Sequence, residues 1–290
     1  MIAYRVLRKI DELRQVVNLQ HLIWGGDAEV VVPLHMLVSL AANGCPVIGA
    51  FEEDLLVGFS LAFFGTDVQG ADRPALANLK LASKRLAVHP DYRSSGIGYQ
   101  LKLQQKAFAD KQGVRLITWT FDPLLSRNAH LYIRKLGGVG RFFIPDFYDE
   151  IPGQVDALGS SDRFICEWWI TSRRVNERLH GSRRDLTAKQ YVGGNAPIIN
   201  PTTDLHGRSL PYEGSAMLGE SHLLLVEIPP DPTPLYADSD YGRGWRNHLR
   251  SVLRQTFESG YIVTDFLHEE YEGRLRSFYV LGFDGGGEFE

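Results

Sequence analysis

The sequence LKLASKRLAVHPDYRSSGIG, residues 79–98, decides the fold class of this chain. Its first half, Leu79–Val88, is predicted to form a strand that ends at His89-Pro90. Its second half is predicted to form a turn, residues 91–98, that leads into a helix over residues 99–112. The helix is expected to bury four of its residues, Leu101, Leu103, Ala107 and Phe108.

The turn has the pattern Arg-x-x-Gly-x-Gly, which is set by Arg93, Gly96 and Gly98. Glycines allow positive φ and a close approach of the backbone to a ligand. The first N–H groups of the following helix have no intrahelical partner, and with the helix dipole they favour an anion such as a pyrophosphate. The dinucleotide fingerprint G-x-G-x-x-G and the Walker A motif are absent. On the turn alone, an anion site and an ordinary turn are equal alternatives.

A second pattern follows the next predicted strand, residues 114–121, which is rich in apolar and β-branched residues. Ser126 is expected to cap a helix over residues 127–136. Asn128 and Tyr132 lie four positions apart and therefore on one face of that helix. The two patterns together favour a functional site over an ordinary turn.

With these two motifs in this order, the chain resembles the GNAT superfamily of acyl-coenzyme A-dependent N-acyltransferases. The residues that carry the resemblance are Arg93, Gly96, Gly98, Asn128, Tyr132, Leu136 and Gly137. The resemblance implies acetyl-CoA or another acyl-CoA as cosubstrate, with the pyrophosphate in the turn and the pantetheine beside the strand end and the second helix. The residues it implies for acyl-CoA binding are Leu86, Ala87, Val88, Arg93, Ser94, Ser95, Gly96, Ile97, Gly98 and Asn128.

A closer resemblance, to a poorly characterised bacterial GNAT-related family with a C-terminal extension, rests on three further segments. These are TWTFDPL at residues 118–124, SDRF at residues 161–164 and EWW at residues 167–169. Tyr132 stands where that closer family has Asn.

The resemblance implies direct attack of an amine on the acyl-CoA thioester. Tyr132 can act as the general acid for the leaving thiolate, and its alternative role is packing. Asp122 follows a predicted strand and is the candidate base, whereas its alternative role is that of a turn residue before Pro123. Glu167 and His89 are weaker candidates for the base. Transfer of this kind needs no metal.

The composition bounds the class of protein. The 290 residues carry a formal net charge of −4 with 44% hydrophobic residues, which is typical of a soluble globular protein and gives no case for nucleic acid or an anionic membrane. The sequence has no signal pattern and no apolar run of membrane-spanning length. Its two cysteines, Cys45 and Cys166, form no Cys-x-x-Cys pair. We therefore expect a cytoplasmic enzyme.

The predicted order of elements is β-α-α-β-β-β-α-β-α-β, an α/β fold with a mixed sheet and helices on both faces. Residues 1–158 are predicted to form the GNAT domain, and residues 159–290 a C-terminal extension. Residues 111–118 and 258–264 both read as helix end, glycine and strand, so the extension is interpreted as a degenerate second GNAT-like half. Residues 181–220 show little periodicity and are predicted to be an excursion over the surface.

The expected function is transfer of an acetyl or succinyl group to the amine of a small metabolite such as an amino acid. Arg127 and Arg163 are candidates to bind a carboxylate, and structural ion pairs are an equal alternative. The alternative function is an acyl-CoA-binding sensor or structural module without turnover. The expected partner is a small-molecule amine, with a homodimer left open.

Overall fold

The computed structural model describes residues 1–25, 30–67, 74–149, 161–205, 208–211, 214 and 221–285. The chain divides into two compact units. The first is built on Met1–Trp119 and includes Trp169–Thr171, and the second is built on the described residues of Thr120–Glu150, Ala157–Trp168 and Ser172–Glu290. The predicted boundary between residues 158 and 159 lies outside the described residues.

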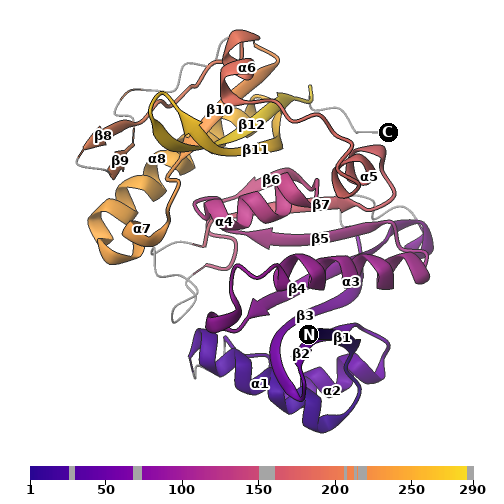
Figure 1. Ribbon diagram of the computed structural model, residues 1–290. Helices are drawn as coiled ribbons and strands as arrows, with labels where there is room; N and C mark the ends of the chain where they lie inside the picture. The colour runs from indigo at the N-terminus through magenta and orange to yellow at the C-terminus, as the bar shows by residue number, and fades with distance from the viewer. Residues whose placement is uncertain are drawn as a thin grey trace. The chain divides into compact units, whose positions relative to one another are not determined.

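The first unit contains a sheet with the strand order β1-β2-β3-β4-β5 (Figure 1). Its strands are antiparallel, except that β4 and β5 run parallel. The elements are β1 (Ile2–Val6), α1 (Ile10–Trp24), α2 (Leu34–Ala42), β2 (Val47–Glu52), β3 (Leu55–Thr66), the 3₁₀ turn Ala75–Asn78, β4 (Leu79–Val88), the 3₁₀ turn Pro90–Tyr92, α3 (Ile97–Lys111) and β5 (Leu116–Phe121). This order confirms the mixed α/β fold.

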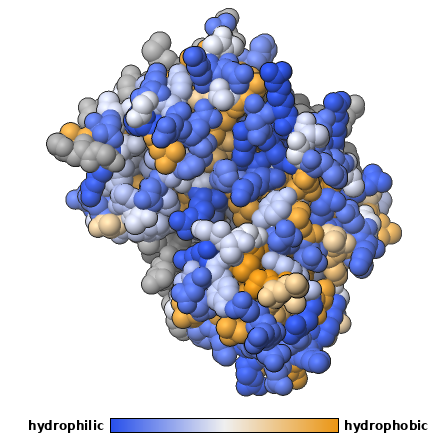
Figure 2. All heavy atoms as spheres, viewed as in Figure 1, coloured by the Kyte–Doolittle hydropathy of each residue, from blue (hydrophilic) through white to orange (hydrophobic). Residues whose placement is uncertain are grey.

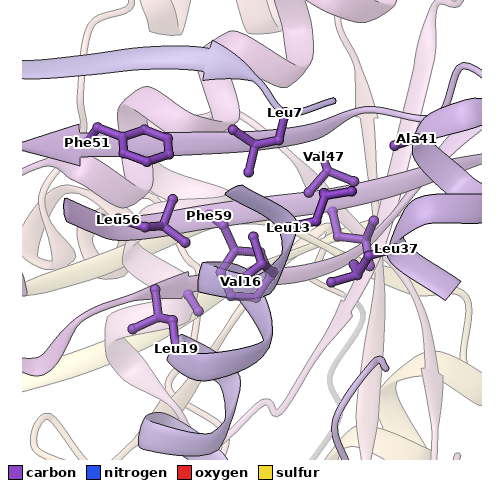
Figure 3. Packing of buried hydrophobic residues seen from close by; sticks show 12 residues of the cluster. Leu7, Leu13, Val16, Leu19, Leu37, Ala41, Val47, Phe51, Leu56 and Phe59 are labelled. Carbon is purple, nitrogen blue, oxygen red and sulfur yellow. The ribbon is translucent and has the colours of Figure 1, made fainter. Parts of the chain in front are cut away.

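Helices cover both faces of this sheet. On one face, α1 and α2 bury a cluster that includes Leu13, Val16 and Leu37 against Phe51 and Phe59 (Figure 3). On the other face, α3 packs on the sheet through a second cluster, which consists of Ile48, Ala50, Val57, Ile97 and Leu101. The alternation of these side chains along β2 and β3 explains why the two strands read as almost continuous apolar runs.

The buried side of α3 differs from the prediction. Leu101 is buried as expected, whereas Leu103 and Phe108 are half-buried and Ala107 is exposed. Four buried positions, Ile97, Leu101, Gln105 and Ala109, follow an i, i+4 stripe, and Lys102 beside it is buried too. The helix begins two residues earlier than predicted, at Ile97.

The two buried polar residues of α3 are hydrogen-bonded. Lys102, only 1% exposed, donates to the Ser83 hydroxyl at 2.8 Å, and Ser83 donates to Gln105 Oε1 at 3.0 Å. The Lys102 ammonium also lies 3.7 Å from the centre of the Trp119 ring, a cation–π contact. These partners explain how a lysine is accommodated in the interior.

The second unit contains an antiparallel sheet with the order β7-β6-β11-β12-β10. Its elements are α4 (Ser126–Ala129), the π-helix His130–Lys135, β6 (Val139–Ile144), β7 (Arg163–Trp169), α5 (Arg173–Leu179), α6 (Ala188–Gly193), β8 (Thr203–Leu205), β9 (Arg208–Leu210), β10 (Leu223–Ile228), α7 (Thr233–Ala237), α8 (Ser239–Glu258), β11 (Tyr261–Tyr271) and β12 (Arg274–Phe283). A C-terminal extension of strands is therefore present, as predicted.

The extension is more regular than its sequence indicated. The described residues of the predicted excursion, residues 181–220, include α6 and the β8–β9 hairpin. Thr187 and Gln190 form a capping box at the start of α6, a signal that the sequence carries. β12 lies between β10 and β11, so the direct parallel pairing of β4 with β5 does not recur in this unit.

The face shown in Figure 2 is mostly hydrophilic, with apolar groups scattered over it and a small apolar patch in the lower half of the view. Such scattered exposure is normal for a globular protein. None of the helices in the described part of the chain is both sufficiently long and sufficiently apolar to span a bilayer.

Candidate functional site

The parallel strands of the first unit separate along their length. The ladder between β4 and β5 runs over Lys80–Leu116, Leu81–Ile117 and Ala82–Thr118. β4 continues past this ladder to Val88, and over Leu86, Ala87 and Val88 it pairs with β3 on its other side. The strand end predicted to bind pantetheine therefore lies beyond the pairs that β4 makes with β5.

The Arg-x-x-Gly-x-Gly turn follows this strand end directly. Gly96 is the N-cap of α3 and has a left-handed conformation with φ 86°. Ser94 is also left-handed, with φ 64°, and the Ser95 hydroxyl donates to the Tyr92 carbonyl at 2.6 Å. Arg93 is exposed, and its Nε lies 3.5 Å from the Val88 carbonyl oxygen. The turn thus places an exposed guanidinium beside the N-terminus of a 15-residue helix.

This geometry suits an anion. The first N–H groups of α3 have no partner within the helix, and the positive end of its dipole lies at Gly96. A Cβ atom built on Gly96 would have open space within 4 Å, so the backbone there is accessible to a ligand. Ile97 is buried and holds the first turn of α3 against the sheet.

Asn128 and Tyr132 belong to the second unit. Asn128 lies in α4, which continues into the π-helix that contains Tyr132. Ser126 is not the cap that the sequence predicted: the N-cap is Leu125, and the Ser126 hydroxyl donates to the Pro230 carbonyl at 2.8 Å. The π-helix is shown by the hydrogen bond from Leu136 N–H to the Leu131 carbonyl, five residues earlier.

Tyr132 is buried, with 9% of its surface exposed, and its ring meets that of Phe121 edge-on at 5.3 Å. Burial raises the pKa of the Tyr132 phenol well above its usual value, and the nearby Cys166 raises it further. The phenol therefore stays protonated throughout the neutral range, which is the state a general acid requires.

Asp122, the candidate base, is engaged in a bidentate ion pair. Arg246 of α8 donates to Asp122 Oδ1 at 2.9 Å and to Oδ2 at 2.5 Å. The Leu124 N–H donates to Oδ1 at 2.8 Å. Arg246 is buried, so this carboxylate fixes α8 to the end of β5. The geometry favours the turn role over that of a base.

The remaining candidate residues are placed as follows. His89 caps the 3₁₀ turn, where its Nδ1 accepts from the Asp91 N–H at 3.3 Å, and so it shapes the turn. Glu167 is half-buried in β7 opposite Val139. Arg163 is buried and donates to the Asp162 carbonyl, which indicates a structural role.

A histidine that the sequence did not single out follows Asn128 on the same helix. Burial lowers the pKa of His130 to about 4, and the neighbouring charges of Lys135, His268 and Arg134 contribute in the same direction. His130 faces His268 of β11, with 6.2 Å between ring centres. It is neutral at physiological pH and half-buried in the second unit.

Both motifs lie within the residues that a protein-family model matches. The model of the acetyltransferase (GNAT) family matches residues 12–137. None of the curated proteins matches this chain. Among solved structures, the ribosomal-protein-S18-alanine N-acetyltransferase of Escherichia coli is similar at 14% identity, with 59% of this chain and 96% of that chain covered and a TM-score of 0.45.

Two further structures are similar over comparable lengths. NAA60 of Arabidopsis thaliana, in complex with a bisubstrate analogue, is similar at 16% identity, with 59% of this chain and 100% of that chain covered and a TM-score of 0.48. The protein yncA of Salmonella typhimurium, with its cofactor acetyl-CoA, is similar at 13% identity, with 65% of this chain and 99% of that chain covered and a TM-score of 0.46. The closer resemblance to a bacterial family with a C-terminal extension stays a prediction. The match to the acetyltransferase (GNAT) family model covers residues 12–137, the part of the chain that contains the Arg93–Gly98 turn, Asn128 and Tyr132.

Proposed function

We propose that this chain transfers an acyl group from acyl-CoA to the amine of a small metabolite by direct attack. The observation that carries the proposal is the Arg93–Gly98 turn, in which a left-handed Gly96 starts α3 beside an exposed arginine. Its place within the matched acetyltransferase domain supports acyl-CoA as the ligand.

The pyrophosphate of acyl-CoA is proposed to bind the N–H groups at Ser94, Ser95, Gly96, Ile97 and Gly98, with Arg93 as a charged donor. The pantetheine is proposed to lie along Leu86, Ala87 and Val88, where β4 has passed its last pair with β5. Asn128 is proposed to bind acyl-CoA, as the family motif implies.

Tyr132 is the proposed general acid. An amine that attacks the thioester carbonyl gives a tetrahedral intermediate, whose collapse breaks the C–S bond and releases the thiolate. The phenol is protonated at neutral pH and can give its proton to that sulfur as the C–S bond breaks. Since Asp122 is paired with Arg246, the proton of the attacking amine goes to water in this proposal.

The proposed acceptor is an amino acid or a related small amine. Arg127 is exposed and directly precedes Asn128, so its guanidinium is available for an acceptor carboxylate. A peptide or protein amine is the competing class. Both acetyl and succinyl donors fit the chemistry of the turn, which recognises only the coenzyme.

One panel tests the function. We expect free thiol to be released from acetyl-CoA or succinyl-CoA with at least one amino acid, in a set that also contains polyamines, aminosugars and a lysine-bearing peptide. Activity confined to the peptide would overturn the small-amine proposal. Binding of acyl-CoA without release in any mixture would favour the sensor alternative, and equal competition by ATP or NAD would indicate a general nucleotide site. Sedimentation of the same sample tests the homodimer.

The Gly96→Val variant is expected to bind acetyl-CoA roughly tenfold more weakly, because valine disfavours the left-handed conformation by about 1–2 kcal/mol and the turn must recover that conformation to bind the pyrophosphate. A Cβ at Gly96 meets no protein atom within 4 Å, so the expected loss comes from a distorted turn and an obstructed ligand. Titration calorimetry with acetyl-CoA measures the change.

Gly113 provides a matched control for this variant. It is exposed at the opposite end of α3, has φ 71°, and also has open space around its added Cβ. Gly113→Val imposes the same kind of backbone strain and is expected to keep the wild-type affinity. Unchanged affinity for acetyl-CoA in Gly96→Val, or an equal loss of affinity in both variants, would contradict the proposal that the pyrophosphate binds at the Arg93–Gly98 turn.

A further inference from the structure

The segment that carries Asn128 and Tyr132 is held along its whole length by the C-terminal extension. We call residues 122–137 the catalytic segment. At its start, Asp122 pairs with Arg246 of α8, and the Pro123 carbonyl accepts from the Tyr279 hydroxyl of β12 at 2.7 Å. Ser126 donates to the Pro230 carbonyl, just after β10.

The end of the catalytic segment is held in the same way. The Leu136 carbonyl accepts from Trp168 Nε1 of β7 at 2.8 Å, and Trp168 is fully buried. The Gly137 carbonyl accepts from Arg174 Nε of α5 at 3.0 Å. Both bonds satisfy carbonyls at a helix C-terminus, which have no partner within the helix.

Between these ends lies the π-helix, which is anchored through Arg134. Arg134 Nη1 lies 3.1 Å from Asp265 Oδ2 of β11, and Asp265 is only 2% exposed. Asp265 is itself fixed by Arg178, whose Nη2 lies 3.0 Å from both carboxylate oxygens. Arg134 also pairs with Asp185 at 3.1 Å.

A π-helical turn is rare, and a helix this short is not stable by itself. α4 spans Ser126–Ala129 and the π-helix spans His130–Lys135, so neighbouring elements must hold the conformation that places Tyr132. These elements belong to the extension, which supplies all of the partners named above.

We propose that the C-terminal extension positions the catalytic segment, and that Arg134, through Asp265, fixes the π-helical turn that carries Tyr132. Arg134 is a positioning residue, because it acts through Tyr132 and not on the substrate. This inference rests on the proposed function for its catalytic consequence, while the anchoring itself is independent of it.

The first test measures the anchoring. In Arg134→Met, Asp265 keeps both bonds from Arg178, and the methionine keeps the apolar stem, so the fold is expected to survive. Amide hydrogen exchange over residues 128–136 is expected to become about tenfold faster. Arg183→Met is the matched control: Arg183 lies 3.5 Å from the same Asp265 carboxylate but outside the catalytic segment. Unchanged exchange in Arg134→Met, or an equal increase in both variants, overturns the proposal.

The second test measures the catalytic consequence with acetyl-CoA and the best amine of the panel. Arg134→Met is expected to lower kcat by about tenfold with little change in the KM for acetyl-CoA. In the Tyr132→Phe background, the same substitution is expected to have almost no further effect, because the group that it positions is gone. An equal fold loss in both backgrounds overturns the proposal. Absence of turnover in the wild-type chain defeats the proposed function alone, since hydrogen exchange still decides the anchoring.

Discussion

Tyr132→Phe is expected to lower kcat for N-acylation by about 10²–10⁴-fold, the usual contribution of a positioned general acid. The substitution removes one hydroxyl from a buried ring whose edge-on contact with Phe121 is retained, so the fold is expected to change little. The affinity for acetyl-CoA is expected to stay unchanged. Steady-state kinetics and calorimetry on the same preparation separate the two quantities.

The control for this variant is another buried tyrosine of the second unit. Tyr191 of α6 is 7% exposed, and burial raises the pKa of its phenol too. Tyr191→Phe is expected to keep kcat within about twofold of the wild type. An equal loss in both variants, or full activity in Tyr132→Phe, would leave Tyr132 with a packing role only.

The pH profile gives an independent check of the same assignment. A group whose pKa is raised keeps its proton to higher pH. At pH values below about 10, the usual pKa of tyrosine, ionisation of Tyr132 is therefore not expected to reduce kcat. A fall of kcat centred well below that value, absent in Tyr132→Phe, would mean that the phenol is far more acidic than its buried setting implies.

Local signals in the sequence predicted many of the elements. The bounds of β4, Leu79–Val88, agree with the prediction, because His89-Pro90 marks its end. The Arg93–Gly98 turn was predictable for the same reason, since strand, turn and helix are contiguous. α3 was predicted to within two residues and with Leu101 correctly buried, whereas the burial of Lys102 and Gln105 depends on contacts with Ser83 and Trp119 that the sequence pattern does not show.

The support of the catalytic segment was not predictable from sequence patterns. Arg246 lies 124 residues from Asp122, and Asp265 lies 131 residues from Arg134. In the sequence alone, a charged residue is interpreted as solvent-exposed, because its partner is distant along the chain. The same holds for Ser126, which the sequence placed as a helix cap and the fold uses as a donor to Pro230. Single-residue signals for these pairs are absent, and only the three-dimensional arrangement reveals them.

A chain that ends at residue 159 is expected to aggregate instead of folding cooperatively, although it contains the whole matched family domain. β6 would lose both of its neighbours in the sheet, β7 on one side and β11 on the other. Its unpaired edges would then promote association between chains. Phe121 and Phe143 would lose Phe164, whose ring centre lies 5.6 and 5.9 Å from theirs. Apolar surface of this kind needs a partner.

The prediction is checked by measuring the solubility, thermal melting and acetyl-CoA binding of the 1–159 fragment. The control is a chain that ends at residue 285, which keeps every contact named above. Phe164→Ala in the full chain isolates one part of the same interface. Phe164 is fully buried, and its loss is expected to cost about 3–5 kcal/mol of unfolding free energy. A soluble 1–159 fragment that melts cooperatively and binds acetyl-CoA as tightly as the full chain would contradict the prediction. It would mean that residues 120–149 fold without the extension, so that the extension cannot be what fixes Tyr132.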